Sequence, residues 1–347
     1  MADDSAVDTP SEPDAAPQQQ ESVTIYDVAK LAGVNPSTVS RALNRPGRVN
    51  AVTERRIRAA AESLNYHVNP MARALPTGRT SIVGLVVSDI TNPVFFDVIR
   101  GAEAAATRAG YTLVLTESEE SDEREYERAQ RMLRMVDGLV LATPRMSDDQ
   151  ITALGRQKPV AVVNRLVDDV LSVVPDVQHG IAEAVRHLRA LGHSRIAYVP
   201  GPPLSWMARR RGELLAQRCE WAHIELVALD PVAPTVLGGR TAAVAVRDSG
   251  ATAVFAYNDL IAIGLMQELV ETGIRIPADI SVVGFDDIFG ADFTSPSLTT
   301  VKSPLREGGD HAMSALLGRV TGGDAPSGGF DLATTLVVRG STGTAKA

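Results

Sequence analysis

"VTIYDVAKLAGVNPSTVSRALN", residues 23–44, decides the fold of the first part of the chain. Its apolar residues recur at spacings of three and four in two short runs, which Gly33 separates. Thr24 is typical of a helix N-cap, and Asn35 followed by Pro36 predicts the start of a second helix. The stretch therefore predicts two helices joined by a tight turn.

The second predicted helix is apolar on one side and polar on the other, where Arg41 is the long hydrogen-bond donor. A third helix, capped near Asn50, follows with the same apolar spacing. Two helices joined by a short turn with glycine are typical of a helix-turn-helix, which lays its second helix in the DNA major groove. The alternative is an ordinary solvated face. The polar side consists of Ser37, Ser40, Arg41 and Asn44.

Charge is distributed unevenly along the 347 residues, whose net charge is -8. Residues 1–22 contain six acidic residues and no Lys or Arg, whereas residues 23–79 contain nine basic residues and three acidic ones. The first segment has few large apolar residues and is typical of a disordered tail. The basic segment at 23–79 favours contact with a polyanion such as DNA. Any single arginine in this segment fits the role of an ordinary surface residue equally well.

Length and composition predict two or three folding units with a large core. No apolar run is long enough to span a bilayer, and no basic segment leads into an apolar run at the N-terminus, so we expect a cytoplasmic protein without membrane contact. The single cysteine, Cys219, excludes an intrachain disulfide. The histidines lack metal-ligand spacing, so we expect no metal and no cofactor.

From about residue 79 onward, predicted strands and helices alternate. The strands are short apolar runs, typical of buried parallel strands, and several helices end at glycine. This pattern predicts two doubly wound subdomains, divided near residue 178, with a cleft between them. The predicted strands are 82–87, 111–115, 138–141, 160–163, 195–199, 253–256 and 281–285.

Polar side chains follow several of these strands. Ligands of open α/β sheets bind beyond the carboxyl ends of the strands, so these side chains predict a site for a small polyhydroxylated ligand. Phe95, Phe255 or Trp206 is a candidate to cover the apolar face of a sugar ring. The polar candidates are Asp89, Asn164, Arg165, Asn258, Asp259 and Asp286.

Each candidate also fits a structural role. Asn258 or Asp259 suits the N-cap of the following helix, Asp89 or Asp286 suits a cap or a bridge between subdomains, and Phe255 suits the core. Enzyme motifs for nucleotides or for a serine nucleophile are absent from the sequence. A glycosidase that uses Asp89 and Asp286 is a weaker alternative, as is a sugar-binding transport protein, which would need export.

The opening stretch, continued by "VNAVTERRIRAAAESLNYHVNPMARAL", resembles the DNA-binding head of the LacI/GalR family of bacterial transcription regulators. The resemblance covers essentially everything after residue 22. It implies a periplasmic-binding-protein-like core, a homodimer on palindromic operator DNA, and repression controlled by a small polyhydroxylated effector, a sugar, polyol or nucleoside. The later motifs that carry it are "SIVGLVVSDITNPVFFDVIRG", "DGLVLATP", "GHSRIAYVPGP", "NDLIAIGLMQEL", "IPADISVVGFDDI" and "PSLTTVKSP".

The resemblance also implies roles for single residues. "NPMARAL" is similar to a hinge helix whose leucine enters the minor groove, although Pro76 replaces the longer polar residue expected there. Arg211 joins the effector contacts, with Arg209 as the other candidate. The predicted DNA-binding residues are Thr24, Ser37, Thr38, Ser40, Arg41, Asn44, Met71, Ala72, Arg73 and Leu75. The predicted effector-binding residues are Asp89, Phe95, Asn164, Arg165, Arg211, Phe255, Asn258 and Asp286.

The predicted fold class is α/β, with an N-terminal all-α helix-turn-helix head and two doubly wound parallel-sheet subdomains. The core, at 80–340, is expected to bind the effector and to dimerise. Its subdomains are predicted at about 80–178 plus 302–322, and at 179–301 plus 323–340. The other predicted regions are an acidic tail at 1–22, the head at 23–68, a hinge helix and linker at 69–79, and a tail at 341–347.

Overall fold

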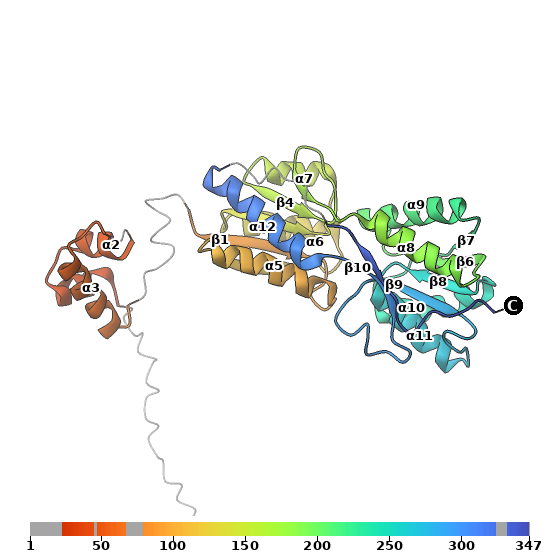
Figure 1. Cartoon of the computed structure of the whole chain (residues 1–347). Helices are drawn as coiled ribbons and strands as arrows, with labels where there is room; N and C mark the ends of the chain where they lie inside the picture. Colours follow the sequence, from red (N-terminus) through yellow and green to blue (C-terminus); the bar gives the residue numbers. More distant parts are fainter. Residues whose placement is uncertain (1–22, 45–46, 67–78, 324–331, 347) are drawn as a thin grey trace, which may run out of the picture. The chain divides into compact units, whose positions relative to one another are not determined.

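The computed structural model describes residues 23–44, 47–66, 79–323 and 332–346 (Figure 1). The chain separates into two compact units, Met1–Gly78 and Arg79–Ala347. The predicted tail at 1–22 and the predicted hinge helix lie outside the described residues.

The first unit contains three helices, α1 (Ile25–Ala32), α2 (Pro36–Asn44) and α3 (Ala51–Ser63). Gly33 ends α1 with a left-handed φ of 62°, and the N–H of Val34 donates to the carbonyl of Ala29 at 3.0 Å. This is a common way to satisfy the last carbonyls of a helix while turning the chain. The three helices enclose a small core of Val28, Ala29, Ala32, Val39, Ala42, Ile57, Ala60 and Ala61.

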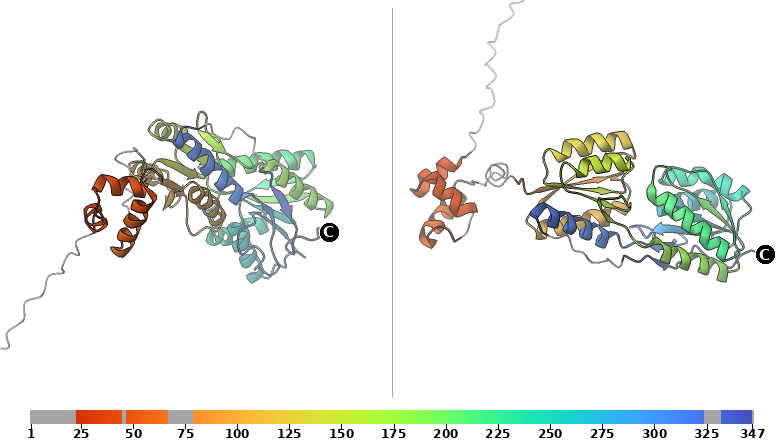
Figure 2. Two further views of the ribbon diagram at one scale, coloured as in Figure 1. Left: turned by 60° about the vertical axis from the view of Figure 1, so that its left-hand side comes forward. Right: turned by 90° about the horizontal axis from the view of Figure 1, so that it is seen from above.

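The first core subdomain is a parallel sheet in the order β2-β1-β3-β4-β5, covered by helices on both faces. Figure 2 shows α5 and α12 on one face and α6 and α7 on the other. Its elements are β1 (Ile82–Val87), α5 (Val94–Arg108), β2 (Thr112–Glu117), α6 (Asp122–Leu133), β3 (Gly138–Ala142), α7 (Asp148–Gly155), β4 (Val160–Val163), β5 (Leu171–Val173) and α12 (Leu305–Thr321).

The second core subdomain is a sheet in the order β11-β10-β9-β8-β6-β7, in which only the β10–β11 pairing is antiparallel among the described strands. Helices α10 and α11 cover one face, and α8 and α9 cover the other. Its elements are α8 (Val177–Ala190), β6 (Arg195–Val199), α9 (Trp206–Trp221), β7 (Glu225–Ala228), α10 (Val236–Asp248), β8 (Ala253–Ala256), α11 (Asp259–Glu271), β9 (Ser281–Asp286), β10 (Thr299–Lys302) and β11 (Thr335–Val337).

The chain passes between the two subdomains three times: from β5 to α8, from β10 to α12, and from α12 to β11. In each sheet the strand order reverses beside the first strand, which creates a switch point between β1 and β3 and another between β6 and β8. Loops diverge at such points and leave room for a ligand at the carboxyl ends of the strands. The predicted fold class is confirmed.

Candidate functional sites: a nucleic-acid interface and a ligand site

The polar face of α2 is exposed in the structure. Ser37 and Arg41 are exposed and Thr38 is half-buried, whereas Val39 and Ala42 are fully buried in the core of the head. The Arg41 Nε donates to the Ser37 carbonyl at 3.2 Å, which leaves the two terminal nitrogens of the guanidinium for other partners. Arginine uses two such nitrogens to bind guanine O6 and N7 together. The exposed face thus offers the donor that the predicted contact with base edges requires.

Thr24 lies at the N-cap of α1, as its sequence position indicates. The carboxylate of Asp27 accepts hydrogen bonds from the Thr24 backbone N–H and hydroxyl, at 2.8 and 2.7 Å. These hydrogen bonds hold the pKa of Asp27 below its usual value. Thr24 thus fixes the start of the helix while remaining exposed.

Basic side chains of α3 and of the preceding loop add positive charge to the head. Arg48, Arg55 and Arg56 are exposed, whereas Arg58 forms an ion pair of 2.8 Å with Glu54 one turn away. The hydrogen bond from Arg58 lowers the pKa of Glu54. An exposed pair of this kind adds little to the stability of the helix.

Only some of the remaining predicted DNA contacts lie within the residues that the structure describes. Ser40 lies on α2 and is half-buried, and Asn44 is the last residue of α2. The predicted hinge contacts Met71, Ala72, Arg73 and Leu75 lie outside the described residues.

In the core, left-handed backbone marks the carboxyl ends of strands. Thr143 after β3, Asn164 after β4 and Asp286 at the end of β9 have φ values of 56°, 63° and 108°. Residues other than glycine rarely adopt such values, and those that do cluster at functional sites. The strained positions thus lie where a ligand of an α/β sheet binds.

Asn164 is buried, and its carboxamide has no hydrogen-bond partner among the described residues. The amide oxygen and nitrogen of Asn164 are not fully buried, so the carboxamide stays in contact with solvent at the end of β4. A ligand with neighbouring hydroxyls can replace that solvent and hydrogen-bond to both ends of the amide. Asn164 is thus a strong geometric candidate among the predicted effector contacts.

Asp286 is paired with Arg211. The Arg211 Nη2 donates to Asp286 Oδ1 at 2.7 Å, and Nη1 donates to the Tyr257 carbonyl at 2.8 Å. The guanidinium carbon lies 3.6 Å from the centroid of the Phe285 ring. By contrast, Arg209 is exposed and donates to the carbonyl of Pro203. The structure therefore places Arg211, and not Arg209, beside the strand ends.

Arg165 points toward the loop after β3. Its guanidinium donates to the Met146 carbonyl and the Asp148 carboxylate, both at 2.6 Å. The Arg165 Nε is buried without a partner. The side chain thus holds the loop that leads into α7.

Four other predicted contacts have clear structural roles. Asn258 is the N-cap of α11: its Oδ1 accepts from the Ile261 N–H at 3.0 Å. Asp89 closes a turn by accepting from the N–H and hydroxyl of Thr91. Phe95 and Phe255 are 3% and 1% exposed and belong to the two hydrophobic cores.

The sequence interpretation missed two residues of this region, Arg145 and Tyr257. Arg145 follows β3 and is buried; its Nε donates to Glu120 at 2.7 Å. Burial opposes the charge of Arg145, but Tyr257 of the other subdomain and Glu120 outweigh it and raise the arginine pKa. Tyr257 follows β8, and its hydroxyl lies 3.2 Å from the Ser205 Oγ. Because both Arg145 and Tyr257 follow predicted strands, their positions in the sequence could have identified them as candidates.

Asp259 is fully buried beside this cluster. Its two oxygens accept from the Thr300 hydroxyl at 2.5 Å and from the Ile288 N–H at 2.9 Å. Burial and the neighbouring Asp286 raise the pKa of Asp259 well above its usual value. These contacts tie the start of α11 to β10 and to the segment that follows β9.

In the described part of the chain, no group of three or more His, Cys, Asp or Glu side chains is arranged to hold a metal ion. No described helix is both long and apolar enough to cross a membrane.

Comparison with known proteins shows what the two units are similar to. Residues 24–69 match the family described as bacterial regulatory proteins, lacI family, and residues 185–342 match the periplasmic binding protein-like domain. The regulator DegA of Bacillus subtilis is 32% identical over 82% of this chain and 88% of its own length. The regulator GalR of Escherichia coli is 33% identical over 81% of this chain and 84% of its own length.

Solved structures give the same result. The lac repressor dimer bound to operator and the anti-inducer ONPF superposes with a TM-score of 0.84 at 29% identity, over 93% of this chain and 100% of the other. A ribose-bound lacI-family regulator from Enterococcus faecium gives a TM-score of 0.67 at 31% identity, over 76% of this chain and 100% of the other. These relatives are transcription regulators, not enzymes. The chain belongs to the lacI family of bacterial regulators and is a DNA-binding transcription regulator.

Proposed function

We propose that this regulator is a cytoplasmic repressor that binds a two-fold symmetric operator as a homodimer, and that a small polyhydroxylated effector controls its affinity for DNA. The exposed polar face of α2, with Arg41 at its centre, supports direct reading of base edges. One head reads one half-site, so a palindromic operator requires two heads.

The effector part of the proposal depends mainly on Asn164. Its carboxamide has no partner among the described residues and stays in contact with solvent, and its position after β4 is where α/β sheets bind ligands. An amide offers both a donor and an acceptor to neighbouring hydroxyls. Asp286 supports the same chemistry, because Arg211 occupies Oδ1 while Oδ2 has no partner in the described chain. Sugars, polyols and nucleosides all carry such hydroxyl pairs.

An exposed apolar surface on the second subdomain supports the homodimer. Val270, Phe289 and Phe293 are 51%, 73% and 70% exposed, and the two phenylalanine rings pack edge to face at 5.1 Å. Ile263 and Met266 of α11 line a hollow of about 500 Å³ beside them. Contiguous exposed apolar surface of this kind marks protein contacts. A second copy of the chain is the proposed occupant.

The three passages of the chain between the subdomains give the proposal its mechanism. Two of them, β5 to α8 and β10 to α12, are short, so each subdomain can turn against the other only about these segments. A ligand bound by residues of both subdomains favours one arrangement. A difference of about 1–3 kcal/mol in effector affinity between two arrangements is enough to change operator occupancy usefully.

The test begins with a thermal-shift screen of sugars, polyols and nucleosides on the full-length protein. We expect at least one of them to raise the melting temperature and to change operator affinity measured by fluorescence anisotropy. The direction of that change distinguishes an inducer from a corepressor. Stabilising ligands that leave operator affinity unchanged at every concentration would contradict the proposed control.

A further inference from the structure

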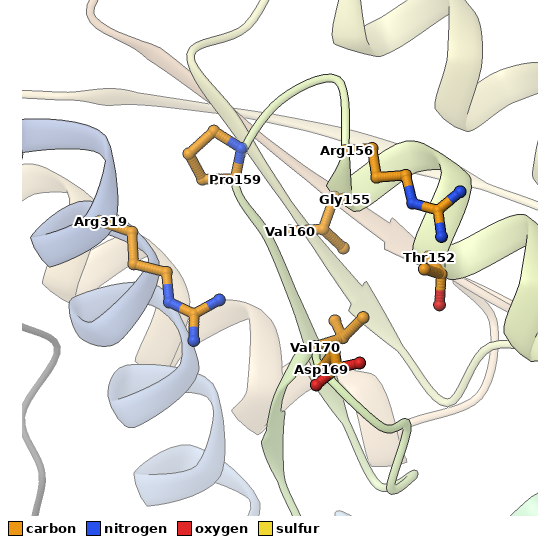
Figure 3. A pocket seen from close by; sticks show the side chains of 8 residues that line it. All are labelled: Thr152, Gly155, Arg156, Pro159, Val160, Asp169, Val170 and Arg319. Atoms are coloured by element: carbon orange, nitrogen blue, oxygen red, sulfur yellow. The ribbon is translucent and has the colours of Figure 1, made fainter.

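A second pocket lies on the first subdomain, at the opposite ends of the strands from the proposed effector site. It has a volume of about 200 Å³ and lies between α7, the start of β4, the β4–β5 loop and α12 (Figure 3). Val160, the first residue of β4, lines it, and so does Val170 just before β5. The pocket is therefore at the amino ends of the strands.

Three charged side chains line this pocket without being paired. Arg156 ends α7, Arg319 lies in the last turn of α12, and Asp169 lies on the β4–β5 loop with a φ of 61°. All three are exposed, and none has a hydrogen bond or ion pair within the part of the chain that the structure describes. Figure 3 shows the two arginines on opposite sides of the pocket.

Most described arginines of the core differ from these two. Arg108 pairs with Asp310 at 2.7 Å, and Arg240 pairs with Glu271 at 2.6 Å. A basic residue near a helix C-terminus is favourable by itself, so neither Arg156 nor Arg319 alone requires a ligand. Two such arginines, from helices far apart in the sequence, line one cavity and have no carboxylate within ion-pair distance.

The chemistry of the lining defines the ligand. Two guanidinium groups suit a phosphate, because their paired N–H groups match its oxygens. Asp169 would repel a phosphate but accepts hydrogen bonds from hydroxyls, and the Thr152 hydroxyl can do the same. We propose that this pocket binds a small phosphomonoester that carries hydroxyl groups, the chemistry of a sugar phosphate. This ligand is separate from the effector of the proposed function.

Gly155 provides a way to close the pocket without changing its charge. A Cβ on Gly155 would meet only Val170, at 3.9 Å, and its φ is not left-handed. A larger side chain therefore fits the backbone and would occupy the cavity. Arg134, the exposed residue that ends α6, is the matched control for Arg156, since both stand at the C-cap of a helix and neither has an ion pair in the described residues.

Calorimetric titration of the full-length protein with glucose 6-phosphate, glucose and inorganic phosphate tests the proposal. We expect glucose 6-phosphate to bind, and inorganic phosphate to bind at least about tenfold more weakly because it lacks the sugar hydroxyls that would donate to Asp169. The affinity for glucose 6-phosphate should fall by about tenfold or more in each of Arg156→Ala, Arg319→Ala and Gly155→Leu. It should stay unchanged in the control Arg134→Ala. Asp286→Asn should leave this binding intact, whatever it does to an effector.

Several results would overturn the proposal. The absence of any binding heat with glucose 6-phosphate would do so, and so would equal affinity of glucose 6-phosphate for the wild type and for Arg156→Ala. Binding lost in Asp286→Asn but kept in Arg156→Ala would assign the phosphate ligand to the other site. Operator affinity that falls in Arg156→Ala and Arg319→Ala without any glucose 6-phosphate would show that the arginines contact DNA phosphates instead.

Discussion

Arg211 and Asp286, 75 residues apart in the sequence, form an ion pair of 2.7 Å in which each side chain is only 5% exposed. The pair joins α9 to the end of β9, and the guanidinium is also held by the Tyr257 carbonyl and the Phe285 ring. Removing one partner of a buried pair leaves the other charge uncompensated, which typically destabilises a protein by about 3–5 kcal/mol. Asp286 therefore has two roles, one in stability and one in the proposed ligand contact.

Asp286→Asn should weaken effector affinity by about tenfold or more, because the charge-assisted hydrogen bonds to ligand hydroxyls are lost. Operator affinity without effector should change little, since the head is a separate unit. Calorimetric titration and an operator gel shift on the same variant measure both. Asp248→Asn, which alters an exposed ion pair, is the control. Unchanged effector affinity in Asp286→Asn would restrict Asp286 to a structural role.

Arg41→Ala should reduce operator affinity by about 1–3 kcal/mol and flatten discrimination at one base pair of each half-site. Arg41 is exposed on α2, with its terminal nitrogens available to a base. Binding to operators with single substitutions measures the discrimination, and Arg134→Ala is a control outside the head. Equal losses on operator and random DNA would identify Arg41 as a phosphate contact.

Leu75→Ala tests the predicted hinge. If this leucine enters the minor groove, the variant should bind the operator more weakly while the slope of log affinity against log salt stays the same. The salt slope counts phosphate contacts, which an apolar side chain does not make. Affinity measured at several salt concentrations separates the two effects. Wild-type affinity in the variant would mean that Leu75 has no role in the groove.

Phe293→Glu should shift the protein from dimer toward monomer. Phe293 is 70% exposed beside Phe289 on the surface proposed for the homodimer, and a charge buried in an apolar interface is strongly unfavourable. Sedimentation velocity over a range of concentrations measures the shift. Trp221→Glu, which places the same charge at another exposed aromatic residue, should leave the dimer intact. A dimer of unchanged stability in Phe293→Glu would place the interface elsewhere.

The sequence predicted the buried strands well and the edge strands poorly. The predicted ranges 82–87, 160–163, 195–199 and 253–256 match β1, β4, β6 and β8. Those strands are continuous apolar runs, buried on both faces. The strands that were missed are β5, β7, β10 and β11, which are short and lie at or near sheet edges, with polar residues such as Thr299 and Thr300.

The candidate site was predictable by position but not by contact. Asn164 and Asp286 follow strands, and their sequence positions predicted a place at the sheet edge. Nothing in the spacing of Arg211 and Asp286 indicates that they pair, because that contact depends on how α9 packs beside β9. An aromatic residue near a strand end packs equally well in the core or against a sugar ring, and packing decides between the two for Phe95 and Phe255.

Glu125 should make the stability of the first subdomain depend on pH. It is fully buried on α6, and its Oε2 accepts from the backbone N–H groups of Arg145 and Met146 at 2.6 and 2.9 Å. Burial raises the pKa of Glu125 to about 7, although the two N–H groups and the nearby Arg145 and Arg165 act in the opposite direction. Its other oxygen, Oε1, has no partner in the described residues.

The folded state therefore keeps a proton on Glu125 at pH values at which the unfolded chain has released it. This contribution to stability is fully present below pH 4.5, is lost as the pH rises through about 7, and is constant above that. The total loss is on the order of 3 kcal/mol. Urea unfolding of Glu125→Gln at several pH values should show a smaller decrease between pH 5 and pH 8 than the wild type. Glu123→Gln, an exposed change on the same helix, should show the same dependence of stability on pH as the wild type. If the wild type, Glu125→Gln and Glu123→Gln all show the same dependence, Glu125 is ionised throughout this pH range.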